Sequence, residues 1–116
     1  MIELQEYWDV DYEITPVHHP KYDRRIKIII KNHSPHKRRF RVKVKGYSLQ
    51  DHQNILHLML YGGINAPIVV EVDRYRKGFA EFDIPRLVAP EKEFIIQFQI
   101  ENLDKGEVKT IEVKLI

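Results

Sequence analysis

Apolar and polar residues alternate with a period of two along most of this chain, which is typical of β-strands that bury one face. The clearest case is the segment 38–47. Phe40, Val42 and Val44 fall on one face of this predicted strand. The other face carries only basic residues, namely Arg39, Arg41, Lys43 and Lys45. The segment therefore predicts a strand with a buried apolar face and a cationic face in solvent.

The same alternation recurs in segments that are separated by turn-forming residues. Strands are predicted at residues 7–15, 25–31, 38–47, 68–73, 79–84, 93–101 and 108–116. The connection 32–37 is too short for a parallel crossover, so we expect a turn between two sheets. We expect Gly106, in a hairpin loop, to take the left-handed conformation. Seven or eight short strands predict one all-β domain over residues 1–116, an antiparallel immunoglobulin-like β-sandwich.

Residues 51–61 admit two interpretations. Asp51 could cap a helix that Gly62 ends, and Leu56 and Leu60 have helical spacing. The apolar run 55–61 is short and dense, however, and residues 51–54 suit a hairpin loop. Periodicity does not separate a strand from a helix in so short a run. We favour an eighth strand and keep the helix as the alternative.

The strand phases predict which side chains form the core. The predicted core residues are Trp8, Val10, Ile28, Ile30, Phe40, Val42, Val70, Phe82, Phe94, Ile96, Phe98 and Val113. Phe79, Ile29 and Val69 fall on outward phases. Together they would form an apolar patch of the kind that marks a subunit contact.

Two passages resemble prokaryotic immunoglobulin-like domains. Residues 26–35 read Ile-Lys-Ile-Ile-Ile-Lys-Asn-His-Ser-Pro before an alternating strand. Residues 82–94 are similar to the apolar-x-Ile-Pro-x-Leu-x-Pro-Gly-Glu passage before the sixth strand of such modules, with Glu91 where Gly is typical. The nearest groups are the cell-adhesion-related domain CARDB, whose paired asparagines are missing after Glu112, and the fibronectin type III-like domains. The resemblance implies an accessory or adhesive part of a larger assembly, and fold does not fix function.

Composition excludes several classes of function. The chain has 116 residues and no cysteine, which excludes disulfides, thiolate metal sites and thiol catalysis. The formal charge of +2 is not that of a dedicated nucleic-acid binder. Abundant Lys, Arg and Glu is also a thermophile-like composition. No apolar run is long enough to span a membrane and the start is no signal peptide, so we expect a cytoplasmic protein if Met1 is the native start.

Histidine and serine are the candidates for metal binding and catalysis. His33 and His36 have metal-ligand spacing, as does the pair His18-His19, but we expect these pairs at opposite ends of the sandwich. Neither serine of the chain lies in a nucleophile elbow. We therefore predict no enzyme, no cofactor and no stoichiometric metal site, and keep a small metal or ligand site at the loop histidines as the weaker alternative.

The cationic face is the best candidate site. We expect strands 93–101 and 108–116 to flank it, so that the site comprises Arg39, Arg41, Lys43, Lys45, Gln97 and Gln99, with Glu101 and Glu112 as acidic neighbours. The acidic row Asp9, Asp11 and Glu13 should lie on the other sheet and face Lys27 and Lys31.

The expected role of this face is binding. It would dock an acidic protein, or the strand 55–61 would form an edge that pairs with a second copy as a homodimer. The alternative is binding of a polyanion or nucleic acid through residues 39–45.

Overall fold

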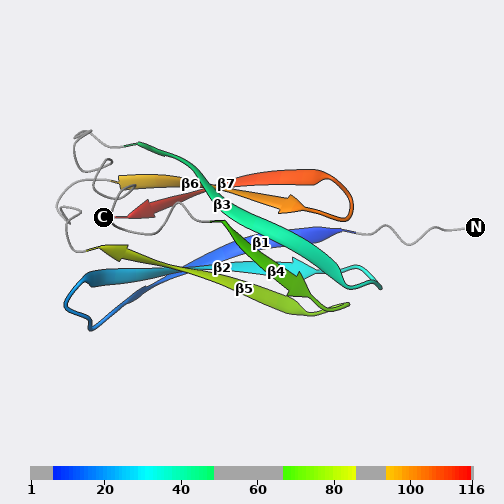
Figure 1. Cartoon of the computed structure of the whole chain (residues 1–116), viewed down its shortest axis with the longest axis horizontal. Helices are drawn as coiled ribbons and strands as arrows, with labels where there is room; N and C mark the ends of the chain where they lie inside the picture. The colour runs from blue at the N-terminus through cyan, green and yellow to red at the C-terminus, as the bar shows by residue number, and fades with distance from the viewer. Residues whose placement is uncertain (1–6, 49–66, 86–93, 116) are drawn as a thin grey trace, which may run out of the picture.

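The computed structural model describes residues 7–48, 67–85 and 94–115. In this part of the chain two antiparallel sheets pack as a β-sandwich (Figure 1). One sheet has the order β1-β2-β5 and the other β4-β3-β6-β7. The strands are β1 (Trp8–Pro16), β2 (Tyr22–Asn32), β3 (Arg38–Ser48), β4 (Ile68–Val72), β5 (Lys77–Pro85), β6 (Phe94–Asn102) and β7 (Glu107–Leu115).

The predicted all-β sandwich is confirmed, with seven strands and no helix among the described residues. The segment 51–61, for which strand and helix were both considered, lies outside them. Predicted and observed strand ends mostly agree within two residues. β1 includes Pro16, which pairs with Arg24 at the end of the ladder, where a proline is tolerated.

The connection after β2 crosses from one sheet to the other, as predicted for residues 32–37. Asn32 fixes this crossing and is only 2% exposed. Its side-chain amide donates hydrogen bonds to the carbonyl oxygens of His36 (2.9 Å), Val72 (3.1 Å) and Asp73 (3.3 Å). Its side-chain oxygen accepts the N–H of Ser34 at 2.9 Å. One buried asparagine therefore ties the β2–β3 connection to the end of β4.

The core lies between the inner faces of the sheets, and the strand phases are confirmed. Of the predicted core residues, most are buried, Val10 and Val70 are partly buried, and the side chain of Phe94 lies outside the described part. The same inward phases also bury Ile26, Val72, Ala80, Ile84 and Ile100.

The prediction for Ile29 needs a refinement. It lies on the outward phase of β2, yet it is only 8% exposed. Its register partners are Asp11 on β1 and Phe79 on β5, so it occupies the middle of the three-stranded sheet. A central position in the sheet therefore shields Ile29 from solvent even though it lies on the outward phase.

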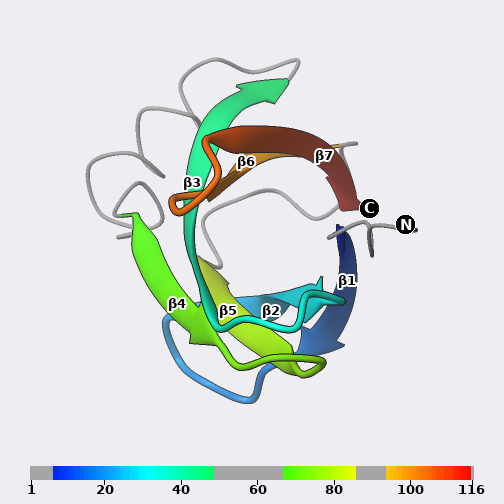
Figure 2. The ribbon, with the colours of Figure 1, turned by 90° about the vertical axis from the view of Figure 1, so that its right-hand side faces the viewer.

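Strands β1 and β7 lie on the same side of the sandwich but in different sheets (Figure 2). Lys109 stands opposite the buried Ile100 in the register, so it projects from the inner face of β7. Its ammonium lies 4.5 Å from the centroid of the Trp8 ring and donates a hydrogen bond to the Trp8 carbonyl oxygen. An inward-pointing lysine on an edge strand also opposes the addition of a further strand.

Strands β4 and β5 approach closely at Gly78, which is buried. A Cβ atom at this position would lie 2.5 Å from Cγ2 of Val72 and 2.9 Å from Cγ1 of Val70. Because both distances are shorter than real Cβ contacts, only glycine fits between these side chains. Gly106 has a different role: its φ is 73°, as predicted for the loop after β6.

Candidate protein-binding face

The cationic face of the sequence analysis is a basic row, Arg39, Arg41, Lys43 and Lys45, on the outer face of β3, as predicted. The strands that flank this basic row differ in part from the prediction. Strand β6 flanks it on one side, and β4 rather than β7 flanks it on the other. Arg39 stands opposite Glu71 of β4, and Arg41 stands between Val69 of β4 and Glu101 of β6. Strand β7 lies one strand further away because it pairs with β6. The strand 55–61, expected at this edge, lies outside the described residues.

Arg39 is held by the β6–β7 hairpin. Its backbone N–H donates to Oδ2 of Asp104 at 2.8 Å, and its guanidinium Nη2 lies 3.3 Å from Oδ1 of the same carboxylate. The backbone hydrogen bond from Arg39 is the main cause that holds the pKa of Asp104 below its ordinary value; desolvation opposes it, and the Arg39 guanidinium lowers the pKa further. Asp104 is thus an acidic partner that the sequence pattern did not identify.

The remaining polar groups of the row are paired unevenly. Nη1 of Arg41 lies 3.7 Å from Oε1 of Glu101, which the sequence did suggest as a neighbour. Gln97 donates a hydrogen bond from Nε2 to Oε1 of Glu112 at 3.1 Å. Gln99 stands opposite Lys43 in the register between β3 and β6.

Lys43 and Lys45 complete the row. Neither forms an ion pair or hydrogen bond through its side chain within the described residues. The register between β3 and β6 shifts between Val44 and Gly46, so Lys45 falls at a bulge and is exposed. A bulge re-aims side chains and bends the strand. The row is therefore neutralised at its Arg39 end and carries free charge at its Lys45 end.

The acidic row of β1 lies on the other sheet, as predicted. Asp9 stands opposite Lys31 and Glu13 opposite Lys27 in the register between β1 and β2. Opposite charges at such positions stabilise a sheet by roughly 0.2–1 kcal/mol. This row therefore does not neutralise the basic face of β3.

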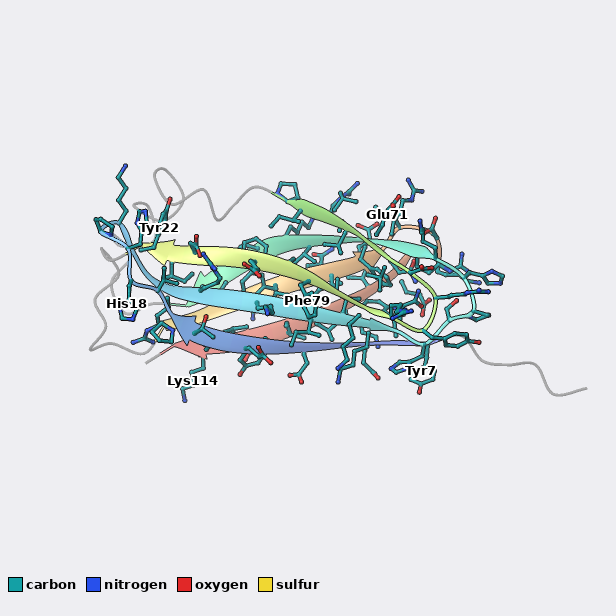
Figure 3. The ribbon with its side chains drawn as sticks, turned by 90° about the horizontal axis from the view of Figure 1, so that it is seen from below. Tyr7, His18, Tyr22, Glu71, Phe79 and Lys114 are labelled. Atoms are coloured by element: carbon teal, nitrogen blue, oxygen red, sulfur yellow. The ribbon has the colours of Figure 1, made fainter. Side chains whose placement is uncertain are left out.

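The histidines lie at two ends of the sandwich. His18 lies at one end, and Tyr7, whose ring stacks on His33 with centroids 4.3 Å apart, lies at the other (Figure 3). His33 Nε2 lies 3.1 Å from Oδ2 of Asp9. No group of three potential metal ligands occurs among the described residues, and His52 and His57 lie outside them. The absence of a metal site stays a prediction.

Ser34 has a structural role in the turn after β2. It is 1% exposed, and its hydroxyl accepts the backbone N–H of His36 at 3.0 Å. The side chain of Ser48 lies outside the described part.

Within the described part of the chain no helix has the length and apolar character needed to cross a membrane.

The predicted apolar patch is divided between the two sheets. Phe79 and Ile29 are register partners on the outer face of the three-stranded sheet, whereas Val69 belongs to β4 in the other sheet. Phe79 is 49% exposed and lies near the middle of its face (Figure 3). The ammonium of Lys27 lies 4.9 Å from its ring centroid. The combination of Phe79 with Val69 in one patch was wrong because strand phase alone does not assign a strand to a sheet.

Comparison with known proteins identifies the fold and goes no further. No family model matches the chain. No curated protein matches it in sequence. Among solved structures it is similar to a FixG-related protein from Vibrio parahaemolyticus, with a TM-score of 0.54 and 13% sequence identity. The match covers 96% of this chain and 94% of that chain. At this identity the similarity shows a shared all-β fold, and it assigns the chain to no named family.

Proposed function

We propose that this chain is a non-enzymatic, immunoglobulin-like binding module that contacts another protein or a second copy of itself through the outer face of its four-stranded sheet. The strand order supports the immunoglobulin-like assignment. Strands β2 and β3 belong to different sheets, and β6 pairs with β3. In constant-type immunoglobulin domains the fourth strand joins the sheet of the first two. Here β4 pairs with β3 instead, so the strand order is immunoglobulin-like without being that of the constant-type domains.

The observation that carries the binding proposal is the uneven pairing of the basic row. Asp104 and Glu101 bind Arg39 and Arg41, so these two side chains hold the sheet and its hairpin together. Lys43 and Lys45 have no such partner among the described residues. The positive charge of these two lysines, beside the partly neutralised arginines, raises the association rate with an acidic partner and orients that partner on the sheet.

The uneven pairing of the basic row supports binding of a polyanion less well than binding of a protein. A nucleic-acid backbone is bound by a row of cations that are each free to contact a phosphate. Two of the four cations of the row are already paired with carboxylates, and these carboxylates would repel phosphate groups. A protein surface, which presents carboxylates at discrete positions, fits the two free lysines better.

The test uses charge reversal at the free end of the row. Lys43→Glu with Lys45→Glu should fold as the parent does, because surface substitutions usually change stability by no more than about 0.5 kcal/mol. We expect this variant to lose salt-sensitive partners that the immobilised parent captures from a lysate, or to lose self-association in sedimentation. Lys21→Glu, a single exposed charge reversal in the β1–β2 connection, is the control and should behave as the parent.

Two outcomes would reject the proposal. One is a parent that is monomeric at all accessible concentrations and captures the same proteins as the Lys43→Glu/Lys45→Glu variant. The other is co-purification of nucleic acid with the parent and its loss in the variant. That second outcome would support the polyanion alternative.

A further inference from the structure

The turn between β4 and β5 is fixed against the β2–β3 connection by backbone hydrogen bonds. The N–H of Arg76 donates to the carbonyl of Asp73 (3.1 Å), and the N–H of Tyr75 donates to the carbonyl of Ser34 (3.3 Å). The N–H of Asn32 in turn donates to the carbonyl of Arg76 at 2.9 Å. The turn is thus part of the end of the sandwich, built on the buried Asn32.

Tyr75 has an unusual conformation in this turn. Its φ is 56°, in the left-handed region that a bulky side chain rarely adopts, and it is 63% exposed. Buried packing therefore does not offset the cost of this conformation, and the hydrogen bonds of the turn enforce it. Such backbone outliers cluster at functional sites, including ligand clamps.

Four cations lie around this turn. Lys31 and Lys77 are direct register partners on the outer face of the three-stranded sheet, and Arg74 and Arg76 flank Tyr75. None of the four side chains has an ion-pair partner within the described ranges. Like charges directly opposite each other destabilise a sheet, and a bound anion would relieve this repulsion.

The nearby carboxylates are engaged elsewhere. Oδ1 of Asp73 accepts the backbone N–H of Arg74 at 2.8 Å. Asp9, opposite Lys31 on β1, contacts His33 through Oδ2 at 3.1 Å. The four cations around the turn therefore outnumber these two carboxylates, and neither carboxylate forms a direct ion pair with any of them within the described residues.

Phe79 extends this basic region with an exposed apolar surface. It lies two residues after Lys77, so both side chains project from the same face of β5. The half-exposed ring stands opposite Ile29, which is itself nearly buried. Exposed aromatic and arginine side chains are the residues that supply most of the binding energy in protein interfaces.

We propose that this aromatic-basic surface, formed by Phe79, Tyr75, Lys31, Arg74, Arg76 and Lys77, binds an acidic segment of a partner protein. An apolar side chain of the segment packs on Phe79, and carboxylates of the same segment reach the four cations. The surface lies on the other sheet from the basic row of β3, so it is a second site beyond the proposed function.

The charge distribution on this face favours a short protein segment over a nucleic acid. Asp9, Asp11 and Glu13 line β1, on the far side of β2 from Phe79. They would repel a phosphate backbone that crossed the sheet, so a ligand must run along β5 toward the turn. A segment with a few carboxylates and one apolar anchor fits that path.

The experiment measures binding of a fluorescently labelled synthetic peptide of alternating glutamate and leucine by anisotropy, at low and at physiological (~0.15 M) ionic strength. We expect Arg74→Glu with Arg76→Glu to weaken binding about tenfold, and Phe79→Ala to weaken it by a similar factor, each a free-energy change of about 1.4 kcal/mol. Lys21→Glu is the control: it reverses an exposed charge at the other end of the sandwich, outside both proposed sites, and should stay within about twofold of the parent. A lysine–leucine peptide should not bind.

Three results would overturn the proposal. The first is no binding of the glutamate–leucine peptide to the parent at low ionic strength. The second is a loss in Lys43→Glu with Lys45→Glu that equals or exceeds the loss in Arg74→Glu with Arg76→Glu, which would place binding on the face of the proposed function. The third is tighter binding of a single-stranded oligonucleotide that depends on the same residues, which would make the surface a nucleic-acid site. Far-UV circular dichroism and urea midpoints close to those of the parent confirm that each variant is folded.

Discussion

Replacing Gly78 by alanine tests the close approach of β4 and β5. The added Cβ would lie 2.5 Å from Cγ2 of Val72 and 2.9 Å from Cγ1 of Val70. Val72 is fully buried at the end of β4, so its side chain has little room to move. Overpacking of this kind usually costs about 1–3 kcal/mol. We expect Gly78→Ala to reduce the free energy of unfolding by about 2 kcal/mol.

A double-mutant cycle identifies the cause of this loss. Val72→Ala alone removes two buried carbons, at about 0.8 kcal/mol each plus a cavity term, so it should cost about 2 kcal/mol. It also removes the Cγ2 atom that an alanine at position 78 would meet. The double variant should therefore be more stable than the sum of the two single losses by at least about 1 kcal/mol. The contact with Val70 remains and limits the recovery.

Urea denaturation, followed by far-UV circular dichroism with unchanged m-values, measures all four corners of the cycle. Gly78→Ala combined with Val108→Ala is the control, because Val108 is half-exposed on β7, away from Gly78, and the two losses should add. Strict additivity with Val72→Ala, or a Gly78→Ala loss below about 0.5 kcal/mol, would refute the steric argument. In that case the two strands would be further apart than the structure places them.

Three further substitutions test other parts of the structure. Phe98→Ala should cost about 3–5 kcal/mol in denaturant melts, because its ring is fully buried, and a loss below about 1 kcal/mol would contradict the phase of β6. Asn32→Ala should cost at least about 2 kcal/mol, because three carbonyls lose a donor, and Asn32→Asp should not rescue it, since a carboxylate accepts from Ser34 but donates to none of them. For Asp104 the folded-state pKa lies below the ordinary 3.8, so its contact with Arg39 is fully stabilising above that pH and is lost as the pH falls through the folded-state value. The stability difference between the parent and Asp104→Asn should therefore shrink in acid melts below about pH 4, and a difference that is constant down to pH ~2 would argue against this ion pair.

Strand phase was predictable from the sequence because it is a local property. Phe40, Val42 and Phe98 alternate with charged or amide side chains, and all three are buried. Periodicity, however, reports no strand order. The neighbour of the basic row was expected to be the last strand and is β4 instead, because pairing depends on how distant segments meet.

The site was predictable only in part for the same reason. The row Arg39, Arg41 and Lys43 could be read directly from the alternation, and Glu101 was expected beside it. Asp104 was not, since it lies 65 residues from Arg39 and its carboxylate is brought there by the hairpin after β6. The only feature of the sequence that pointed to Asp104 was that its hairpin follows strand 93–101, which was expected beside the basic row.

The side of the sandwich where β1 and β7 lie together has an internal optical reporter. Trp8 is the single tryptophan of the chain, it is 2% exposed, and its indole N–H has no hydrogen-bond partner among the described residues. A buried indole emits at shorter wavelength than one in water, and the ammonium of Lys109 lies over this ring. Tryptophan emission therefore reports on the packing around Trp8, which includes its contact with Lys109 of β7 and with the Phe40 ring of β3. A ligand or a solvent condition that loosens this side would shift the emission to longer wavelength while the circular dichroism of the remaining strands is still intact.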